Sequence, residues 1–177
     1  ISIGLVGSEM CIRDRANATN ITSFTADSST SNSGTANLTT KVGGGTIDIG
    51  NSTTGAYSLT GLSGNDTLKG NGNADIINGG GGDDNIDGRG GNDEINGGAG
   101  DDIITVSSAG QGDGDTIDGG SGTDTLSLSS GSHAFATDAK LQNINSITLA
   151  STSTVIDLTG QTESLTITGG AQAAVSY

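Results

Sequence analysis

The stretch NGGGGDDNIDGRGGNDEINGGAGDDIIT, residues 78–105, consists largely of glycine and aspartate, two residues with low helix propensity. Within it, one aliphatic residue returns at a fixed interval: Ile86, Ile95 and Ile104 are nine residues apart. A constant spacing in such a polar sequence indicates a repeat architecture, in which each unit adds one residue to a continuous core.

An aspartate marks each unit of the repeat. Asp66, Asp75, Asp84, Asp93 and Asp102 are nine apart, and Asp124 lies nine after Asp115. Two residues after each of these aspartates stands a large aliphatic residue: Leu68, Ile77, Ile86, Ile95, Ile104, Ile117 and Leu126. Residues 61–127 therefore contain seven nonapeptide units, and the four residues VSSA at 106–109 separate the fifth unit from the sixth.

The shared pattern is G-G-x-G-x-D-x-U-x, with U a large aliphatic residue. Residues 61–127 resemble the RTX, or hemolysin-type, calcium-binding nonapeptide repeats. The resemblance implies an all-β fold, a parallel β-roll or β-solenoid with calcium-binding Gly/Asp turns, flanked here by further strand segments. Seven near-copies make this resemblance much more specific than one copy would.

The residue types in one unit suit a turn followed by a short strand. In residues 97–105, Gly97, Gly98 and Gly100 can adopt positive φ and let carbonyl oxygens point inward. Asp102 adds a carboxylate at the end of that turn, and the last three residues, IIT, favour an extended strand. Because side chains alternate along a strand, we expect Ile104 to point inward and its neighbours outward.

Carbonyl and carboxylate oxygens on a flexible loop suit Ca²⁺, which takes six to eight oxygen ligands, better than Mg²⁺. The array holds no His or Cys, which argues against zinc or copper. The resemblance implies several ions, each shared by turns one coil apart, with pairs 66/84, 75/93, 84/102, 93/115 and 102/124. The candidate ligands are the carboxylates Asp66, Asp75, Asp84, Asp93, Asp102, Asp115 and Asp124 and the turn residues Gly64, Gly79, Gly81, Gly82, Gly88, Gly90, Gly91, Gly97, Ala99, Gly100, Gly119, Ser121 and Gly122.

The charge supports a role for cations in folding. The net charge of the chain is −14, and residues 61–127 hold twelve Asp and one Glu against one Lys and one Arg. One aliphatic residue in nine buries little apolar surface, and stacked carboxylates repel one another. We therefore expect Ca²⁺ to fold this segment. An acidic chain without 18 consecutive apolar residues favours neither nucleic acid binding nor membrane insertion.

Some units depart from the pattern. The second has Asn71, Asn73 and Ala74, which puts its half-site in doubt, and the sixth has Asp113 where glycine is usual. Four further aspartates lie beside the pattern, and we expect them to be solvated surface charges: Asp83, Asp87, Asp101 and Asp118.

The flanks carry a weaker pattern. In 128–177, Ile147, Ile156 and Leu165 are nine apart, as are Leu149, Leu158 and Ile167, which favours three stacked strands of a continuing solenoid over three strands of an antiparallel sandwich. In 16–60, TIDIG and YSLTG indicate strands, whereas residues 16–45 are rich in Ser, Thr and Asn and suit irregular strands or a linker. Residues 133–144 have helical character, as a bulge or cap, and we expect His133, the sole histidine, to be exposed.

Residues 1–15 differ in composition from the rest and contain the only Cys and the only Met. Their end, VGSEMCIRDR, resembles a translated sequencing-adaptor remnant; a linker or an eroded signal peptide is the alternative. We expect a fragment of a longer protein. Without further cysteines, residues 16–177 cannot form a disulfide.

Three functions compete. The first is a structural calcium-binding module of a secreted bacterial protein, adhesin-like or surface-layer-like, which the resemblance implies is exported by type I machinery and folds outside the cell. The second is the tail of a secreted metalloprotease or lipase whose catalytic domain is absent; with no GxSxG or HExxH pattern, this chain itself is expected to be inactive. The third, an ice-binding roll, would need a regular Thr row along the turns, which the third positions of the units lack.

Overall fold

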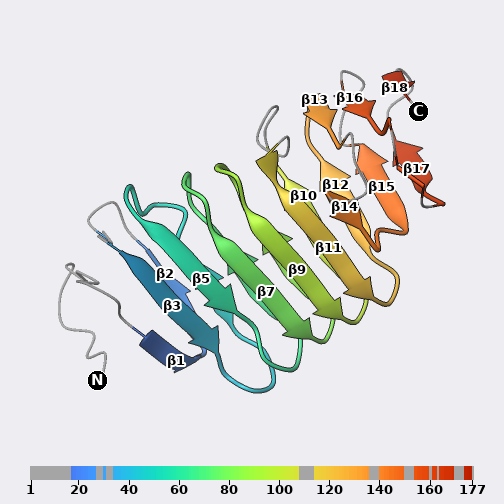
Figure 1. The fold of residues 1–177 in the computed structure, drawn as a ribbon. Helices are drawn as coiled ribbons and strands as arrows, with labels where there is room; N and C mark the ends of the chain where they lie inside the picture. The colour runs from blue at the N-terminus through green and yellow to red at the C-terminus, as the bar shows by residue number, and fades with distance from the viewer. Residues whose placement is uncertain are drawn as a thin grey trace.

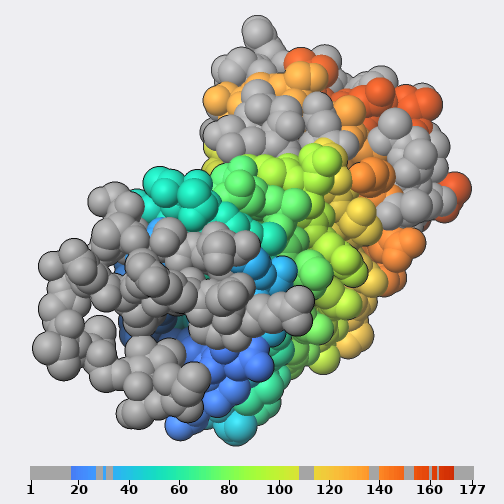
Figure 2. Space-filling model, turned by 60° about the vertical axis from the view of Figure 1, so that its left-hand side comes forward, coloured from blue at the N-terminus to red at the C-terminus, as the bar shows by residue number. Residues whose placement is uncertain are grey.

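The chain winds back and forth between parallel β-sheets in the computed structural model, so that each coil adds one strand to each sheet (Figure 1). In the space-filling view the coils follow one another as coloured bands from the N-terminal to the C-terminal end (Figure 2). The structure describes residues 17–26, 30, 34–107, 114–135, 140–149, 154–159, 161–162, 164–169 and 174–176.

Two long sheets form the main walls. The first, sheet A, has the order β1 (Asn17–Ile21), β3 (Thr35–Thr40), β5 (Ala56–Thr60), β7 (Ile76–Gly81), β9 (Glu94–Ala99), β11 (Thr116–Ser121) and β14 (Leu141–Gln142). The second, sheet B, has the order β17 (Thr166–Gly169), β15 (Ser146–Leu149), β12 (Thr125–Leu128), β10 (Ile103–Val106), β8 (Asn85–Asp87), β6 (Thr67–Lys69), β4 (Thr46–Asp48) and β2 (Ser23–Thr25). Consecutive nonapeptide units thus lie on opposite walls.

The repeated aliphatic residues form the core. In sheet A, Ile77 pairs with Ile95 and Ile95 with Ile117, and sheet B aligns the aliphatic residues of the other units in the same way. All seven are at most 2% exposed. Ile104 is fully buried while its neighbour Ile103 is 47% exposed, which confirms the predicted alternation in this strand.

The described residues of 17–60 belong to the same solenoid. As predicted, TIDIG contains β4 and the first four residues of YSLTG lie in β5, and the Ser/Thr/Asn-rich residues before them supply β1, β2 and β3. Leu38 pairs with Leu59, and Ile47 with Leu68, so the core continues without a break into the repeat array.

A third sheet appears after residue 128, formed by β13 (Gly131–Ala134), β16 (Thr154–Asp157) and β18 (Ala174–Ser176) (Figure 1). All its pairings are parallel, so the solenoid prediction is confirmed and the antiparallel sandwich is wrong. The nine-residue spacing is misleading there, because Ile147 pairs with Ile167 in sheet B whereas Ile156 lies in the third sheet. Longer coils explain the change: paired positions are 18 residues apart inside the regular array and 19 to 24 apart here.

Two predictions for residues 133–144 are wrong. The described residues of this stretch contain strand β14 and the end of β13 rather than a helix; residues 136–139 lie outside the described part. His133 is fully buried because it points inward from β13, with Nε2 3.3 Å from the Ser129 carbonyl oxygen.

Among the residues described, no helix is long and apolar enough to cross a membrane.

Candidate metal centre

The seven repeat aspartates form two columns, one along each edge of the flattened coil. Column one comprises Asp66, Asp84, Asp102 and Asp124, in the turns that lead into sheet B; column two comprises Asp75, Asp93 and Asp115, in the turns that lead into sheet A. The structure brings together every pair expected from the sequence: each Asp lies one coil from the next member of its column. All seven are at most 2% exposed.

One carboxylate oxygen of each aspartate is used within the column. The Oδ1 atom of Asp84 accepts the backbone N–H of Asp66 at 2.7 Å, and that of Asp102 accepts the N–H of Asp84 at 2.8 Å. Column two repeats the arrangement, with the N–H of Asp93 donating to Asp115 Oδ1 at 2.8 Å. These bonds hold each carboxylate at a fixed place between two coils.

The second oxygen is different. The Oδ2 atom is buried and has no hydrogen-bond partner in five of the aspartates: Asp66, Asp84, Asp93, Asp102 and Asp124. A buried carboxylate oxygen without a donor is strongly unfavourable unless a cation or proton compensates it. Five such atoms at equivalent places therefore indicate five positions for a positively charged ligand.

Backbone carbonyls face four of these orphaned oxygens, those of Asp66, Asp84, Asp102 and Asp124. A Cβ added at Gly79 would collide with both Asp84 Oδ2 and the carbonyl oxygen of Gly97, and one added at Gly97 would meet Asp102 Oδ2 and the Gly119 carbonyl oxygen. The first glycine of each unit thus leaves a space that a side chain would fill. Oxygen atoms from two successive coils border that space.

The remaining predicted ligand residues lie in the same turns or in the strand ends beside them, because the sheet A strands run further into the glycine-rich positions than predicted and end at Gly81, Ala99 and Ser121. Gly82, Gly100 and Gly122 have positive φ and stack over one another, as a left-handed turn requires. The carbonyl oxygens of Ala99 and Ser121 accept N–H bonds from Gly82 and Gly100. Of the other predicted ligand residues, Gly81 is the last residue of β7, and four lie in equivalent turns: Gly64, Gly88, Gly90 and Gly91. Nowhere in the described chain do three His, Cys, Asp or Glu side chains converge, so carbonyls must supply most ligands of any cation here.

Burial raises the pKa of five of these carboxyl groups: Asp75, Asp84, Asp93, Asp102 and Asp124. The pKa rises to about 6 for Asp75 and Asp84 and to about 8 for Asp93, with loss of hydration as the main cause; bonds from backbone N–H groups oppose the rise. Neighbouring carboxylates, chiefly Asp115 and then Asp75, add to the increase at Asp93. The site is thus an electrostatically unfavourable place for anions and a favourable one for a divalent cation.

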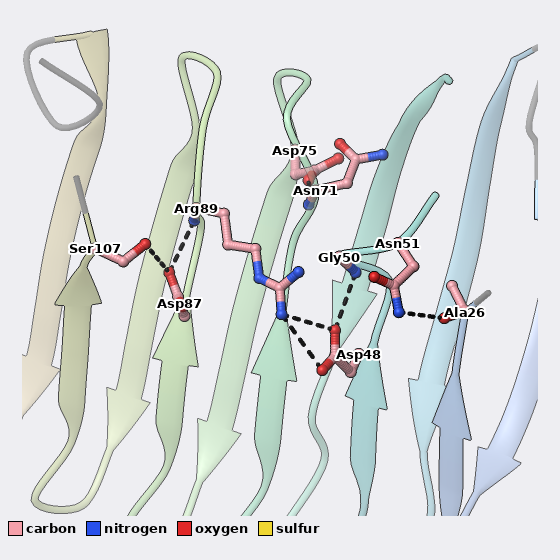
Figure 3. Close-up of polar contacts among 9 residues, drawn as sticks. All are labelled: Ala26, Asp48, Gly50, Asn51, Asn71, Asp75, Asp87, Arg89 and Ser107. Carbon is pink, nitrogen blue, oxygen red and sulfur yellow. Dashed lines mark hydrogen bonds and ion pairs between the residues drawn. The ribbon is translucent and has the colours of Figure 1, made fainter. Parts of the chain in front are cut away.

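The second unit forms a different turn. The backbone N–H of Asn71 donates to Asp75 Oδ2 at 2.8 Å (Figure 3). Asn73 in turn donates its N–H to Asn71 Oδ1. Asp75 Oδ1 already accepts the N–H of Tyr57. Both oxygens of Asp75 are therefore satisfied, and the interval between Asp75 and Asp93 fits a cation less well than the others.

The aspartates beside the pattern are more ordered than expected. Asp83 and Asp101 are exposed, as predicted, yet they form an outer ladder, since the N–H of Asp101 donates to Asp83 Oδ1 at 3.0 Å. Asp87 is half-buried and accepts the N–H of Arg89, whose guanidinium reaches Asp48 at 3.1 Å (Figure 3). Asp118 likewise accepts the Gly120 N–H, and Asp113 lies outside the described residues.

Sequence reasoning missed the ends of the columns. Column one begins at Gly45, whose N–H donates to Asp66 Oδ1 at 2.5 Å, and ends at Asn145, whose Oδ1 accepts the N–H of Asp124 at 2.6 Å. Neither residue stands in a nonapeptide of the pattern, and the 21-residue separation from the neighbouring aspartate hides the relationship.

Comparison with protein families bears on the identity of this array. The family model of the RTX calcium-binding nonapeptide repeat, which describes four copies, matches residues 53–86, 78–108 and 109–132. Residues 53–132 are RTX repeats. No curated protein and no solved structure matches the chain. RTX repeats are calcium-binding structural modules. The turns of this chain fit Ca²⁺, because they present orphaned carboxylate oxygens and facing carbonyl oxygens, and oxygen atoms are the ligands that Ca²⁺ takes.

Proposed function

We propose that this RTX segment binds several Ca²⁺ ions between successive coils and that these ions fold it. The observation that carries the proposal is the set of five buried Oδ2 atoms without partners. With a divalent cation bound, each carboxylate gains a counterion and the columns become attractive contacts. Without the cation, residues 61–127 combine 13 acidic side chains with one inward aliphatic residue in nine.

The proposed ligands are the aspartates of column one and Asp93 and Asp115 of column two, together with carbonyl oxygens of the turns that face them. The aspartates hold the ion by charge, and the backbone bonds to their Oδ1 atoms fix their orientation. The bound ion supplies the positive charge that the site lacks. Nothing in this arrangement provides a nucleophile paired with a base, so the role is structural rather than catalytic.

The proposed setting is the outside of a bacterial cell. RTX repeats are typical of secreted bacterial proteins, and a chain that needs Ca²⁺ to fold would remain extended in a low-calcium cytosol. Weak extracellular calcium sites work in the range of roughly 10⁻⁴–10⁻³ M. Export through type I machinery followed by folding outside the cell is consistent with both properties.

Far-UV circular dichroism during a calcium titration tests the proposal. We expect little β-structure in EGTA, a cooperative gain of β-signal with Ca²⁺, and a much weaker response to Mg²⁺. A β-rich spectrum that persists in excess EGTA at neutral pH would show that the fold does not depend on the ion. Equal responses to Ca²⁺ and Mg²⁺ would contradict the assignment of the metal.

A further inference from the structure

One of the five orphaned oxygens, Asp124 Oδ2, faces a coil that contains no repeat aspartate. In column one, Asp66, Asp84 and Asp102 each have an aspartate one coil further on, but Asp124 is the last of the repeat aspartates. Its Oδ2 is nevertheless buried and unpartnered like the others, and Asp124 itself is fully buried. The coil that covers it comes from residues 143–146, beyond the last residue matched by the family model.

The covering turn reproduces the backbone pattern of the column. Along column one, the carbonyl oxygen of each aspartate accepts the N–H of the residue that starts the next strand in sheet B, as Asp102 does from Thr125 at 2.9 Å. The Asp124 carbonyl oxygen accepts the N–H of Ser146 at 3.1 Å, and that of Asn145 accepts the N–H of Thr166 at 3.0 Å; one bond is added to the pattern, since Asn145 also donates its N–H to the Asp124 carbonyl oxygen at 3.0 Å. Asn145 therefore occupies the aspartate position of the next coil.

The side chain of Asn145 also makes the column bond. Its Oδ1 accepts the N–H of Asp124 at 2.6 Å, as Asp124 Oδ1 accepts the N–H of Asp102 at 2.9 Å. The carbonyl oxygen of Asn143 takes the place of the first-glycine carbonyl, because a Cβ at Gly119 would meet both this oxygen and Asp124 Oδ2. Asn143 adopts φ 54°, the left-handed conformation that glycine adopts elsewhere in the turns.

We propose that Asp124 Oδ2, the Asn143 carbonyl oxygen and Asn145 Oδ1 border a further Ca²⁺ site, which closes column one at its C-terminal end. The inference rests on the proposed function of the RTX segment. An amide suits the last position, because its oxygen faces the ion while its nitrogen stands where an aspartate would present a second oxygen. Because the Asn145 side chain is uncharged, column one ends without a carboxylate that would need one more cation.

This site differs from the others in two ways. It has one carboxylate instead of two, and Asn145 is exposed, so water completes the coordination shell. Fewer charged ligands lower calcium affinity, so this ion binds last and exchanges fastest. Its loss would loosen the junction between the RTX segment and the three-walled coils that follow.

Calcium counting on the full chain tests the site. Equilibrium dialysis at saturating Ca²⁺, with calcium measured by atomic absorption, is compared for the wild type, Asn145→Ala and the control Asn96→Ala, which removes an exposed amide from β9. We expect Asn145→Ala to bind one ion fewer than the wild type and Asn96→Ala to bind the same number. An unchanged count in Asn145→Ala overturns the proposal.

A second variant guards against a folding defect in Asn145→Ala. Asn145→Asp keeps the acceptor for the Asp124 N–H and adds a charge, so we expect an unchanged count and a lower dissociation constant for the last ion. If Asn145 only caps the column, the added carboxylate faces Asp124 without a cation, and an unchanged or higher constant then overturns the site. Absence of calcium binding by the wild type would instead overturn the proposed function itself.

Discussion

Asp102 and Asp124 are 22 residues apart in the sequence but one coil apart in the fold, where the N–H of Asp102 donates to Asp124 Oδ1 at 2.9 Å. Asp84 and Asp102 make the same bond at 2.8 Å across 18 residues. The four extra residues after the fifth unit therefore leave column one intact. Val106, the first of them, extends β10 by one buried residue, so part of the insertion lengthens a wall.

Column two tolerates the same insertion, since Asp93 and Asp115 keep their bond across 22 residues. In both columns the distance along the chain is free to vary, whereas the distance between coils is fixed by the parallel sheets. The geometry of an ion site depends on how two turns stack. This stacking is set by the strand register and not by the length of the repeat.

Replacing Gly97 by Ala should damage one site directly. The new Cβ would collide with Asp102 Oδ2 and with the carbonyl oxygen of Gly119, and neither can move without disturbing the column. Overpacking of this kind costs roughly 1–3 kcal/mol. We expect the calcium midpoint of folding, followed by circular dichroism, to rise. Gly72→Ala is the matched control, because no atom lies within 4 Å of its added Cβ.

Two of the three column-two aspartates, Asp75 and Asp93, should respond differently to replacement by asparagine. Asp93→Asn places an amide nitrogen at the orphaned Oδ2 position, so we expect one bound ion to be lost. In Asp75→Asn the amide nitrogen must face either the N–H of Asn71 or that of Tyr57, which costs about 1–3 kcal/mol of stability without changing the number of ions. Equilibrium dialysis and thermal unfolding separate these effects. Loss of an ion in Asp75→Asn would contradict this distinction.

Ile103 and Ile104 test the alternation of the strand. Ile104 is fully buried among the paired aliphatic residues of sheet B, and its replacement by Ala should lower the free energy of unfolding by about 2–5 kcal/mol. Ile103 is 47% exposed on the outer face, so Ile103→Ala should change the stability of the calcium-loaded protein little. Denaturant titration in saturating Ca²⁺ measures both. Similar losses for the two variants would argue against the observed orientation of β10.

The sequence predicts which residues pair between coils only where the same residue types return at a constant spacing. Before the four-residue insertion each coil of the RTX array has the same length, so Asp66 and Asp84 could be paired from their positions alone. After residue 128 the coils lengthen and a third wall forms, and a nine-residue spacing no longer identifies neighbours: Ile147 pairs with Ile167. His133 was misjudged for the same reason, since its burial depends on that wall.

Other features depend on backbone direction, which the sequence pattern does not encode. Asn71 pointed to a doubtful half-site, but only the structure shows its N–H occupying Asp75 Oδ2. Asn145 carries no signal of its own, because an isolated asparagine 21 residues after Asp124 resembles any other polar loop residue. The short sequence NIN at 143–145, with two amides around a buried aliphatic residue, would be the pattern to seek in related chains.

Acid should replace calcium in part as a folding agent. Burial raises the pKa of folded Asp75 and Asp84 to about 6 and of Asp93 to about 8, whereas an unfolded Asp has a pKa of about 3.9. Between these values the folded state binds more protons than the unfolded state. The stability of the metal-free fold is therefore fully present below about pH 4 and is lost as pH rises toward 8.

We accordingly expect metal-free protein to show more β-structure at pH 4.5 than at pH 8 by far-UV circular dichroism, in buffers stripped of metal with a chelating resin. Protons and Ca²⁺ compete for the same oxygens, so the calcium midpoint should fall as pH rises from 6 to 8, and binding should release protons into a weakly buffered solution. Asp93→Asn should flatten this dependence near pH 8, because it removes the group with the highest of the three pKa values. Metal-free protein that is best folded at pH 8 would show that the column carboxylates are hydrated rather than buried in the absence of ions.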